Sequence, residues 1–70
     1  MKFEKLSIKE EFIRLDSAMK LSNMAVTGGH AKIVIQNGEV KVNGEICTMR
    51  GKKLRKGDSV EFEGNGIVIE

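Results

Sequence analysis

The spacing of the hydrophobic residues changes at Asn37-Gly38, and this change constrains the fold more than any other feature of the chain. Before it, apolar residues recur at intervals of three and four, as on one face of a helix. After it, they alternate with polar residues, as in a half-buried strand. The sequence therefore predicts an α+β fold, in which two short helices pack on a small, mainly antiparallel β-sheet.

Both helices are predicted before Gly38, where glycine favours the left-handed conformation that ends a helix. The first is placed at residues 14–23 and its start could be confused with a strand over residues 11–14. The second follows Thr27, whose hydroxyl is a good N-terminal cap. Its apolar residues are Ala31, Ile33, Val34 and Ile35.

The strands are predicted from alternation and from turn residues. Asn43-Gly44 is a strong two-residue hairpin signal, so the chain should return antiparallel through Ile46. Lys56-Gly57-Asp58 predicts a turn, and Gly64-Asn65-Gly66 predicts another that leads into a last strand. The predicted strands lie around residues 3–8, 40–42, 46, 60–63 and 67–69.

With 70 residues, the chain is expected to form one domain over residues 1–70, whose stability depends on apolar packing. A single cysteine, Cys47, excludes an internal disulfide, and no cluster of Cys or His predicts a metal site or another cofactor. Apolar side chains must therefore supply the core. Those expected in it include Phe3, Phe12, Phe62, Met19, Met24, Met49 and Cys47.

The chain contains no run of about 18 apolar residues, the minimum for a membrane-spanning helix. Residues 1–12 are also too charged for a secretory signal peptide. The unpaired thiol of Cys47 is in keeping with a reducing compartment. We therefore expect a cytoplasmic protein, without a membrane partner and monomeric.

Residues 50–56, here called the basic segment, carry five positive charges in seven positions and no acid. Residues 41–56 hold six bases and one acid, whereas residues 57–70 hold four acids and no base. A basic loop between strands forms a fixed cationic surface that suits phosphate, although such loops often serve only solubility. Leu54, its one apolar residue, is expected to anchor the segment to the core.

Four motifs follow one another along the chain. They are Arg14-Leu15-Asp16-x-x-Met19, Ala31-Lys32-x-x-Ile35, Gly38-x-Val40-x-Val42-Asn43-Gly44 and Leu54-x-x-Gly57-Asp58-x-Val60. As an ordered set over about residues 12–63, they resemble the RNA-binding domain of ribosomal protein S-four, and in particular its short stand-alone members. The resemblance implies the αL motif, in which two helices and a following hairpin bind structured RNA. It implies ribosomal RNA as the first candidate partner and transfer RNA as the next.

The resemblance and the charge pattern together give ten candidate RNA-binding residues. They are Arg14, Gly28, Gly29, Lys32, Lys41, Asn43, Arg50, Lys52, Lys53 and Arg55. Arg50 is the best single candidate, because its planar guanidinium can bind phosphate at two points or stack on a base. Lys32 and Lys41 are expected to join the basic segment on one face, with the acidic last strand away from it.

Several candidates also have structural explanations. Arg14 can pair with Asp16 or Glu10. Gly28-Gly29 can admit a phosphate to a helix N-terminus, but we favour a tight turn between the helices. Many family members have Ser-Arg where this chain has Thr27-Gly28, so an arginine often counted among RNA contacts is missing.

Asn43 tolerates the left-handed conformation of a turn, and this role is favoured over RNA contact. Met49 is assigned to the core, but beside Arg50 it could also touch a base. His30 has no second histidine and no flanking carboxylate, so it is expected to be a surface residue or a marginal RNA contact, not a catalyst.

No enzyme motif is present, and the absence of Tyr and Trp disfavours binding of single strands by stacked bases. Folded RNA, read by its shape and phosphate positions, is the favoured ligand. The alternative is a protein-interaction module whose basic face docks an acidic partner surface.

Overall fold

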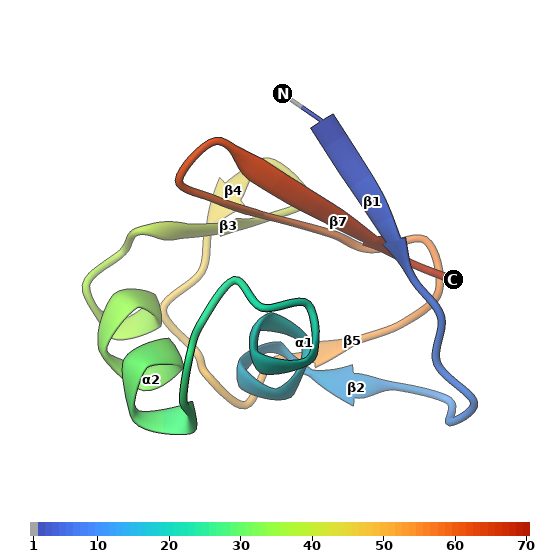
Figure 1. The fold of residues 1–70 in the computed structure, drawn as a ribbon, viewed down its shortest axis with the longest axis horizontal. Helices are drawn as coiled ribbons and strands as arrows, with labels where there is room; N and C mark the ends of the chain where they lie inside the picture. The colour runs from blue at the N-terminus through green and yellow to red at the C-terminus, as the bar shows by residue number, and fades with distance from the viewer. Residues whose placement is uncertain (1) are drawn as a thin grey trace.

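Two short helices lie against one face of a five-stranded sheet, and a two-stranded ladder lies beside the first helix (Figure 1). The computed structural model describes residues 2–70. The strands are β1 (Lys2–Leu6), β2 (Ile13–Arg14), β3 (Val40–Val42), β4 (Glu45–Ile46), β5 (Lys53–Leu54), β6 (Ser59–Phe62) and β7 (Asn65–Ile69). The helices are α1 (Leu15–Leu21) and α2 (Gly28–Gln36). The α+β class predicted from the sequence is confirmed.

The larger sheet has the strand order β1-β7-β6-β3-β4, and the ladder joins β2 to β5. Every pair is antiparallel except β1–β7, which is parallel. The first and last strands of the chain therefore lie side by side, as Figure 1 shows. Among residues 2–70, neither helix has the length and apolar character needed to cross a lipid bilayer.

The core lies between the sheet and the helices. Alternation along β3 and β6 turns one set of side chains inward, and the helices meet them with their apolar stripes. The most deeply buried residues are Leu15, Ala18, Met19, Ala31, Ile35, Val40, Leu54 and Val60. Burial of each large apolar side chain contributes roughly 1.5–3 kcal/mol to folding.

The boundaries of α2 follow the predicted signals. The Thr27 hydroxyl accepts a hydrogen bond from the backbone N–H of His30 at 3.0 Å, which caps the helix. The His30 ring accepts a second one from Val26 N–H at 3.3 Å, so His30 also helps to fix the helix entry. At the other end, Gly38 has φ 77°, in the left-handed region. Both predicted ends are confirmed.

The predicted hairpin at Asn43-Gly44 is confirmed, with φ values of 52° and 85° that match a type I′ turn. The last turn was misplaced, because Glu63 and Gly64 form it with φ values of 51° and 78°. The strand β7 already begins at Asn65. A glutamate rarely adopts this conformation, so the sequence rule passed over it.

Two phenylalanines predicted for the core lie outside it. Phe3 is 43% exposed and Phe12 is 36% exposed, whereas Phe62 is buried. The ring of Phe3 covers Gly66, where a Cβ would lie 2.7 Å from the ring. Phe12 precedes Ile13, which faces inward, so alternation along the strand turns Phe12 outward.

Of the other residues predicted for the core, three are buried or partly buried and one is exposed. Met19 is fully buried, and Met24 and Cys47 are partly buried against the core. Met49 is 65% exposed, so its assignment to the core was wrong. It lies in the irregular stretch between β4 and β5.

Candidate nucleic-acid interface

The basic segment is not a free loop, because its centre forms a strand. Lys53–Leu54 make up β5, which pairs with β2 in the register Ile13↔Leu54 and Arg14↔Lys53. Leu54 is fully buried, as predicted for the anchor of the segment. Antiparallel partners lie on the same face of a ladder, so Arg14 and Lys53 project together on the face opposite to Leu54.

Backbone hydrogen bonds attach the same segment to the start of α1. The carbonyl of Lys52 accepts from Leu15 N–H at 2.8 Å, and that of Arg50 accepts from Asp16 N–H at 3.1 Å. The first N–H groups of a helix have no partner within it, so the segment acts as the cap of α1. These bonds hold the backbone from which the cations project.

Arg14 lies along this segment. Its guanidinium donates a hydrogen bond to the Asp16 carboxylate at 3.1 Å, and its side chain remains about half exposed. A Cβ on Gly51 would lie 3.8 Å from the guanidinium, so the two residues are close neighbours. The pairing with Asp16 that the sequence suggested is confirmed.

Asn43 and Asp58 connect the hairpin to the end of the basic segment. The Asn43 amide donates to Asp58 at 3.1 Å and accepts from Ser59 N–H at 2.9 Å. The second oxygen of Asp58 accepts from Arg55 N–H at 2.8 Å. Asn43 therefore has the turn role favoured from the sequence, together with a connecting role that sequence reasoning missed.

The same contacts lower the pKa of Asp58. The hydrogen bond from Arg55 N–H is the largest cause, and the amide of Asn43 and the charges of Lys52 and Arg55 act in the same direction. Partial burial opposes them and is outweighed. The carboxylate is thus held ionised next to the cations.

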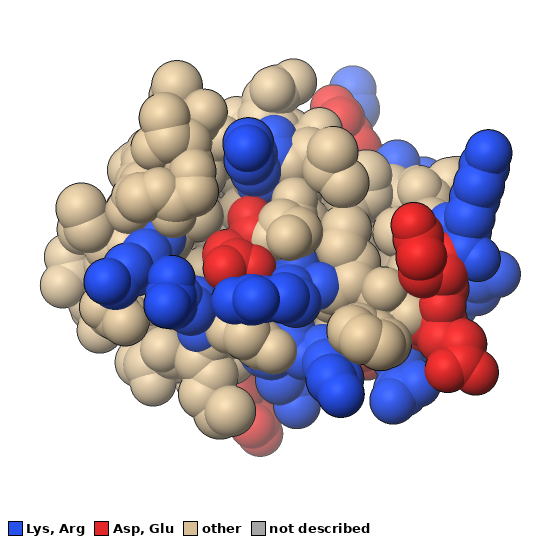
Figure 2. All heavy atoms as spheres, turned by 90° about the horizontal axis from the view of Figure 1, so that it is seen from below, with Lys and Arg blue, Asp and Glu red and all other residues tan. Residues whose placement is uncertain are grey.

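All ten predicted RNA-binding residues are exposed. Figure 2, which views the molecule from below Figure 1, shows Lys and Arg side chains in a band from the area of α2 to the area of β2 and β5. A few acidic atoms interrupt the band, and a separate acidic group lies at one edge. The name basic face is used below for the five exposed cations Arg14, Lys32, Arg50, Lys52 and Lys53, of which Arg14 and Lys53 project together from the β2–β5 ladder.

Lys41 does not join this face. It alternates with Val40 and Val42, which are buried against the helices, so it lies on the outer face of the sheet. There its cross-strand neighbour is Glu61. The prediction that Lys41 shares a face with Lys32 was therefore wrong.

Gly28 and Gly29 also differ from the favoured interpretation. They are the first two residues of α2, and neither has a positive φ, so they are not a tight turn between the helices. A Cβ on Gly28 would meet no atom within 4 Å. The surface above this helix end is open.

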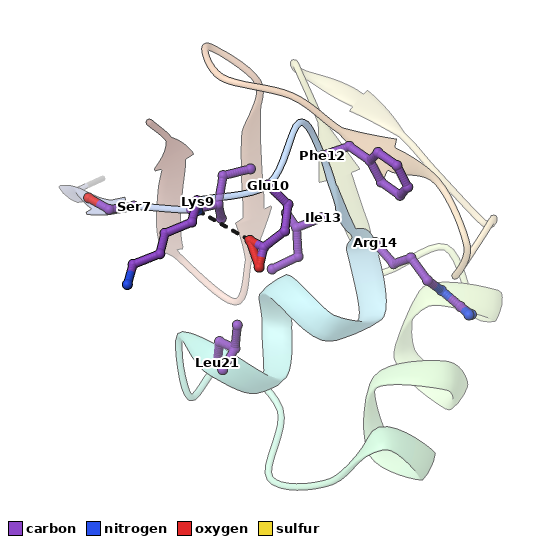
Figure 3. Close-up of a pocket in the computed structure, with 8 residues that line it drawn as sticks. Ser7, Lys9, Glu10, Phe12, Ile13, Arg14 and Leu21 are labelled. Carbon is purple, nitrogen blue, oxygen red and sulfur yellow. Dashed lines mark hydrogen bonds between the residues drawn. The ribbon is translucent and has the colours of Figure 1, made fainter.

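A hollow of about 560 Å³ adjoins β2 and is shown in Figure 3. Its lining consists of Ser7, Ile8, Lys9, Glu10, Phe12, Ile13, Arg14 and Leu21. The Glu10 carboxylate accepts from Lys9 N–H at 3.2 Å. It is the only carboxylate of the lining, so the hollow does not present paired acids.

Within residues 2–70, no three His, Cys, Asp or Glu residues gather closely enough to hold a metal ion.

Two adjoining helices, a hairpin after them and a returning strand that holds the first helix define a small α+β domain of the S-four type. The sequence matches the S4 domain family over residues 6–70, and the chain belongs to this family. The resemblance inferred from the four motifs is confirmed.

Two relatives match nearly their whole length. The chain is 44% identical over 61 residues to the "Probable ribosome maturation protein RlbA" of Bacillus subtilis. The aligned residues cover 87% of this chain and 86% of the relative. It is 33% identical over 61 residues to the "Putative RNA-binding protein YbcJ" of Escherichia coli, with 87% of each chain covered.

Proposed function

We propose that this protein binds structured RNA through the basic face and has no catalytic activity of its own. One observation carries the proposal. The cations of the basic segment project from a backbone that is fixed to α1 and β2 by hydrogen bonds and by the buried Leu54. Because the backbone is already ordered, only the side chains lose conformational freedom when these cations meet phosphates. Membership of the S4 domain family supports the same function.

Phosphate oxygens are the chemical target of this face. Arg50 supplies a planar fork for two-point contact, and Lys52 and Lys53 supply point charges beside it. Lys32 extends the face along α2, and the first N–H groups of α2 at Gly28 and Gly29 offer donors to a further phosphate. Arg55 directly follows β5, and it is proposed to contact the phosphate backbone of the same RNA. Lys41 and Asn43 have weaker claims, since one faces Glu61 and the other is engaged with Asp58.

Ribosomal RNA is the proposed partner, with transfer RNA second, in the cytoplasm. The support is a relative whose name refers to ribosome maturation. Association with an acidic protein surface is the rival. A pull-down from cell extract distinguishes RNA binding from association with an acidic protein. Nuclease treatment should release partners that are bound through RNA and should leave directly bound proteins in the complex.

The direct test replaces Arg50, Lys52 and Lys53 together with alanine. Affinity for a folded ribosomal RNA fragment, measured by titration at fixed salt, should fall by more than tenfold, because three phosphate contacts are lost. The melting temperature should change little, since exposed charges contribute about 0–1 kcal/mol each.

Lys41→Ala is the matched control, because it removes a charge from the other side of the sheet and should affect binding much less. Wild-type affinity in the triple variant would contradict the proposal.

A further inference from the structure

The ring of Phe12 lies beside a cation instead of in the core. Phe12 is 36% exposed, and the Lys53 ammonium lies 4.8 Å from the centre of its ring, a cation–π distance. Figure 3 shows Phe12 and Arg14 projecting to the same side of β2, while Ile13 turns away from them. An aromatic surface is thus built into the basic face.

The other two phenylalanines have structural roles that Phe12 lacks. Phe62 is buried, and Phe3 covers Gly66 at the sheet edge. Within residues 2–70, Phe12 is therefore the one aromatic ring next to the basic segment. Phe12 is also one of the residues that line the hollow, together with Ile8, Ile13 and Leu21.

We propose that Phe12 is a stacking site for an unpaired nucleobase of the RNA, an inference that rests on the RNA-binding function proposed above. The base would lie against the exposed part of the ring, beside the Lys53 ammonium. The phosphates that flank an extruded base would then meet Arg14 and Lys53. Neutral aromatic surface next to positive charge fits a nucleotide, which combines a planar base with an anionic linkage.

The inference changes the expected ligand. A surface made only of cations would bind an uninterrupted duplex as well as one with a bulge. A stacking site favours RNA whose helix presents at least one unstacked base, as in bulges and loops. Stacking makes little distinction between bases, because each has a π face, so the preference should depend on the unpaired position more than on its identity.

The experiment compares two RNA hairpins that differ by a single bulged nucleotide. The bulge carries 2-aminopurine, whose fluorescence reports stacking. The wild-type protein should bind the bulged hairpin about tenfold more tightly than the paired one and should change the fluorescence of the probe. Phe12→Leu should remove both effects while it retains affinity for the paired hairpin, because the cations remain.

Two further variants make the test specific. Phe12→Trp keeps an aromatic ring and should retain the preference for the bulge. Phe3→Leu alters another partly exposed phenylalanine away from the basic face and should leave binding of both hairpins unchanged. If Phe12→Leu does not fold, as judged by circular dichroism, the fluorescence change with the wild type and with Phe12→Trp decides the question. Its absence in both overturns the inference.

The outcomes separate the two proposals. Equal binding of both hairpins by the wild type, or a bulge preference that persists in Phe12→Leu, overturns the stacking site and leaves the phosphate-binding face intact. Failure of the wild type to bind either hairpin overturns the RNA-binding function and the stacking site together.

Discussion

At the scale of single residues, the carboxylate of Asp58 connects two turns that are distant in sequence. It accepts from the Asn43 amide and from Arg55 N–H, so the hairpin and the end of the basic segment are held together. Ordinary turn rules explain why Asp58 follows Gly57, but not why it reaches Asn43. That contact depends on the pairing of β3 with β6, which brings the two turns side by side.

The lowered pKa of Asp58 predicts a dependence of stability on pH. When the pKa of a carboxyl group is lower in the folded state, the stabilisation is present above its unfolded pKa and is lost as the pH falls through the folded pKa. The free energy of unfolding should therefore decrease as the pH drops below about 4. Asp58→Asn should be less stable than the wild type at pH 7, by roughly 1 kcal/mol, and should lose less on acidification.

Urea denaturation at pH 7 and pH 3 measures both effects. Glu63→Gln removes an exposed turn carboxylate that accepts no hydrogen bond from a side chain among residues 2–70, and it serves as the control. Identical pH profiles for Asp58→Asn and the wild type would show that the Asp58 carboxylate does not stabilise the fold.

At the scale of elements, the parts that local signals define were predicted well. Thr27 and Gly38 mark the ends of α2, and Asn43-Gly44 defines the hairpin. The β2–β5 ladder was not predicted, because two-residue strands have too little alternation to detect and their pairing depends on contacts far apart in sequence. The outward position of Phe12 was missed for the same reason. A strand at residues 11–14, considered from the sequence, would have placed Phe12 and Ile13 on opposite faces.

The ladder predicts that one buried side chain supports the basic face. Leu54→Ala should lower the free energy of unfolding by about 2–5 kcal/mol, because it leaves a cavity where a fully buried leucine packs. Lys53→Ala, the adjacent exposed position in β5, should change stability by less than about 1 kcal/mol. Thermal or urea denaturation of the two variants gives the comparison. Equal stabilities would mean that Leu54 does not anchor the segment.

At the scale of the whole molecule, a net charge of only +2 conceals a separation of charge. The backbone of the basic segment is bonded to α1 and β2, while Lys41 and Glu61 neighbour each other on the outer face of the sheet. An uneven distribution of charge produces an electrostatic field that orients an anionic ligand as it approaches the protein. Its net charge alone would predict weak and unoriented attraction.

This separation predicts how binding depends on salt. Each phosphate that a cation neutralises releases counterions, so the logarithm of the affinity should fall linearly with the logarithm of the salt concentration. Lys52→Ala should reduce the magnitude of the slope by about one unit and weaken different folded RNAs to a similar extent. Arg50→Lys keeps the charge, and therefore the slope, but removes the planar fork, so the affinity that it loses measures two-point recognition.

Lys41→Ala should leave the slope unchanged, because its charge lies away from the basic face. Titrations of one folded RNA at four or more salt concentrations provide all the slopes. If Lys41→Ala reduced the slope as much as Lys52→Ala, the RNA would be responding to total charge, and the orientation of the basic face would have no part in binding.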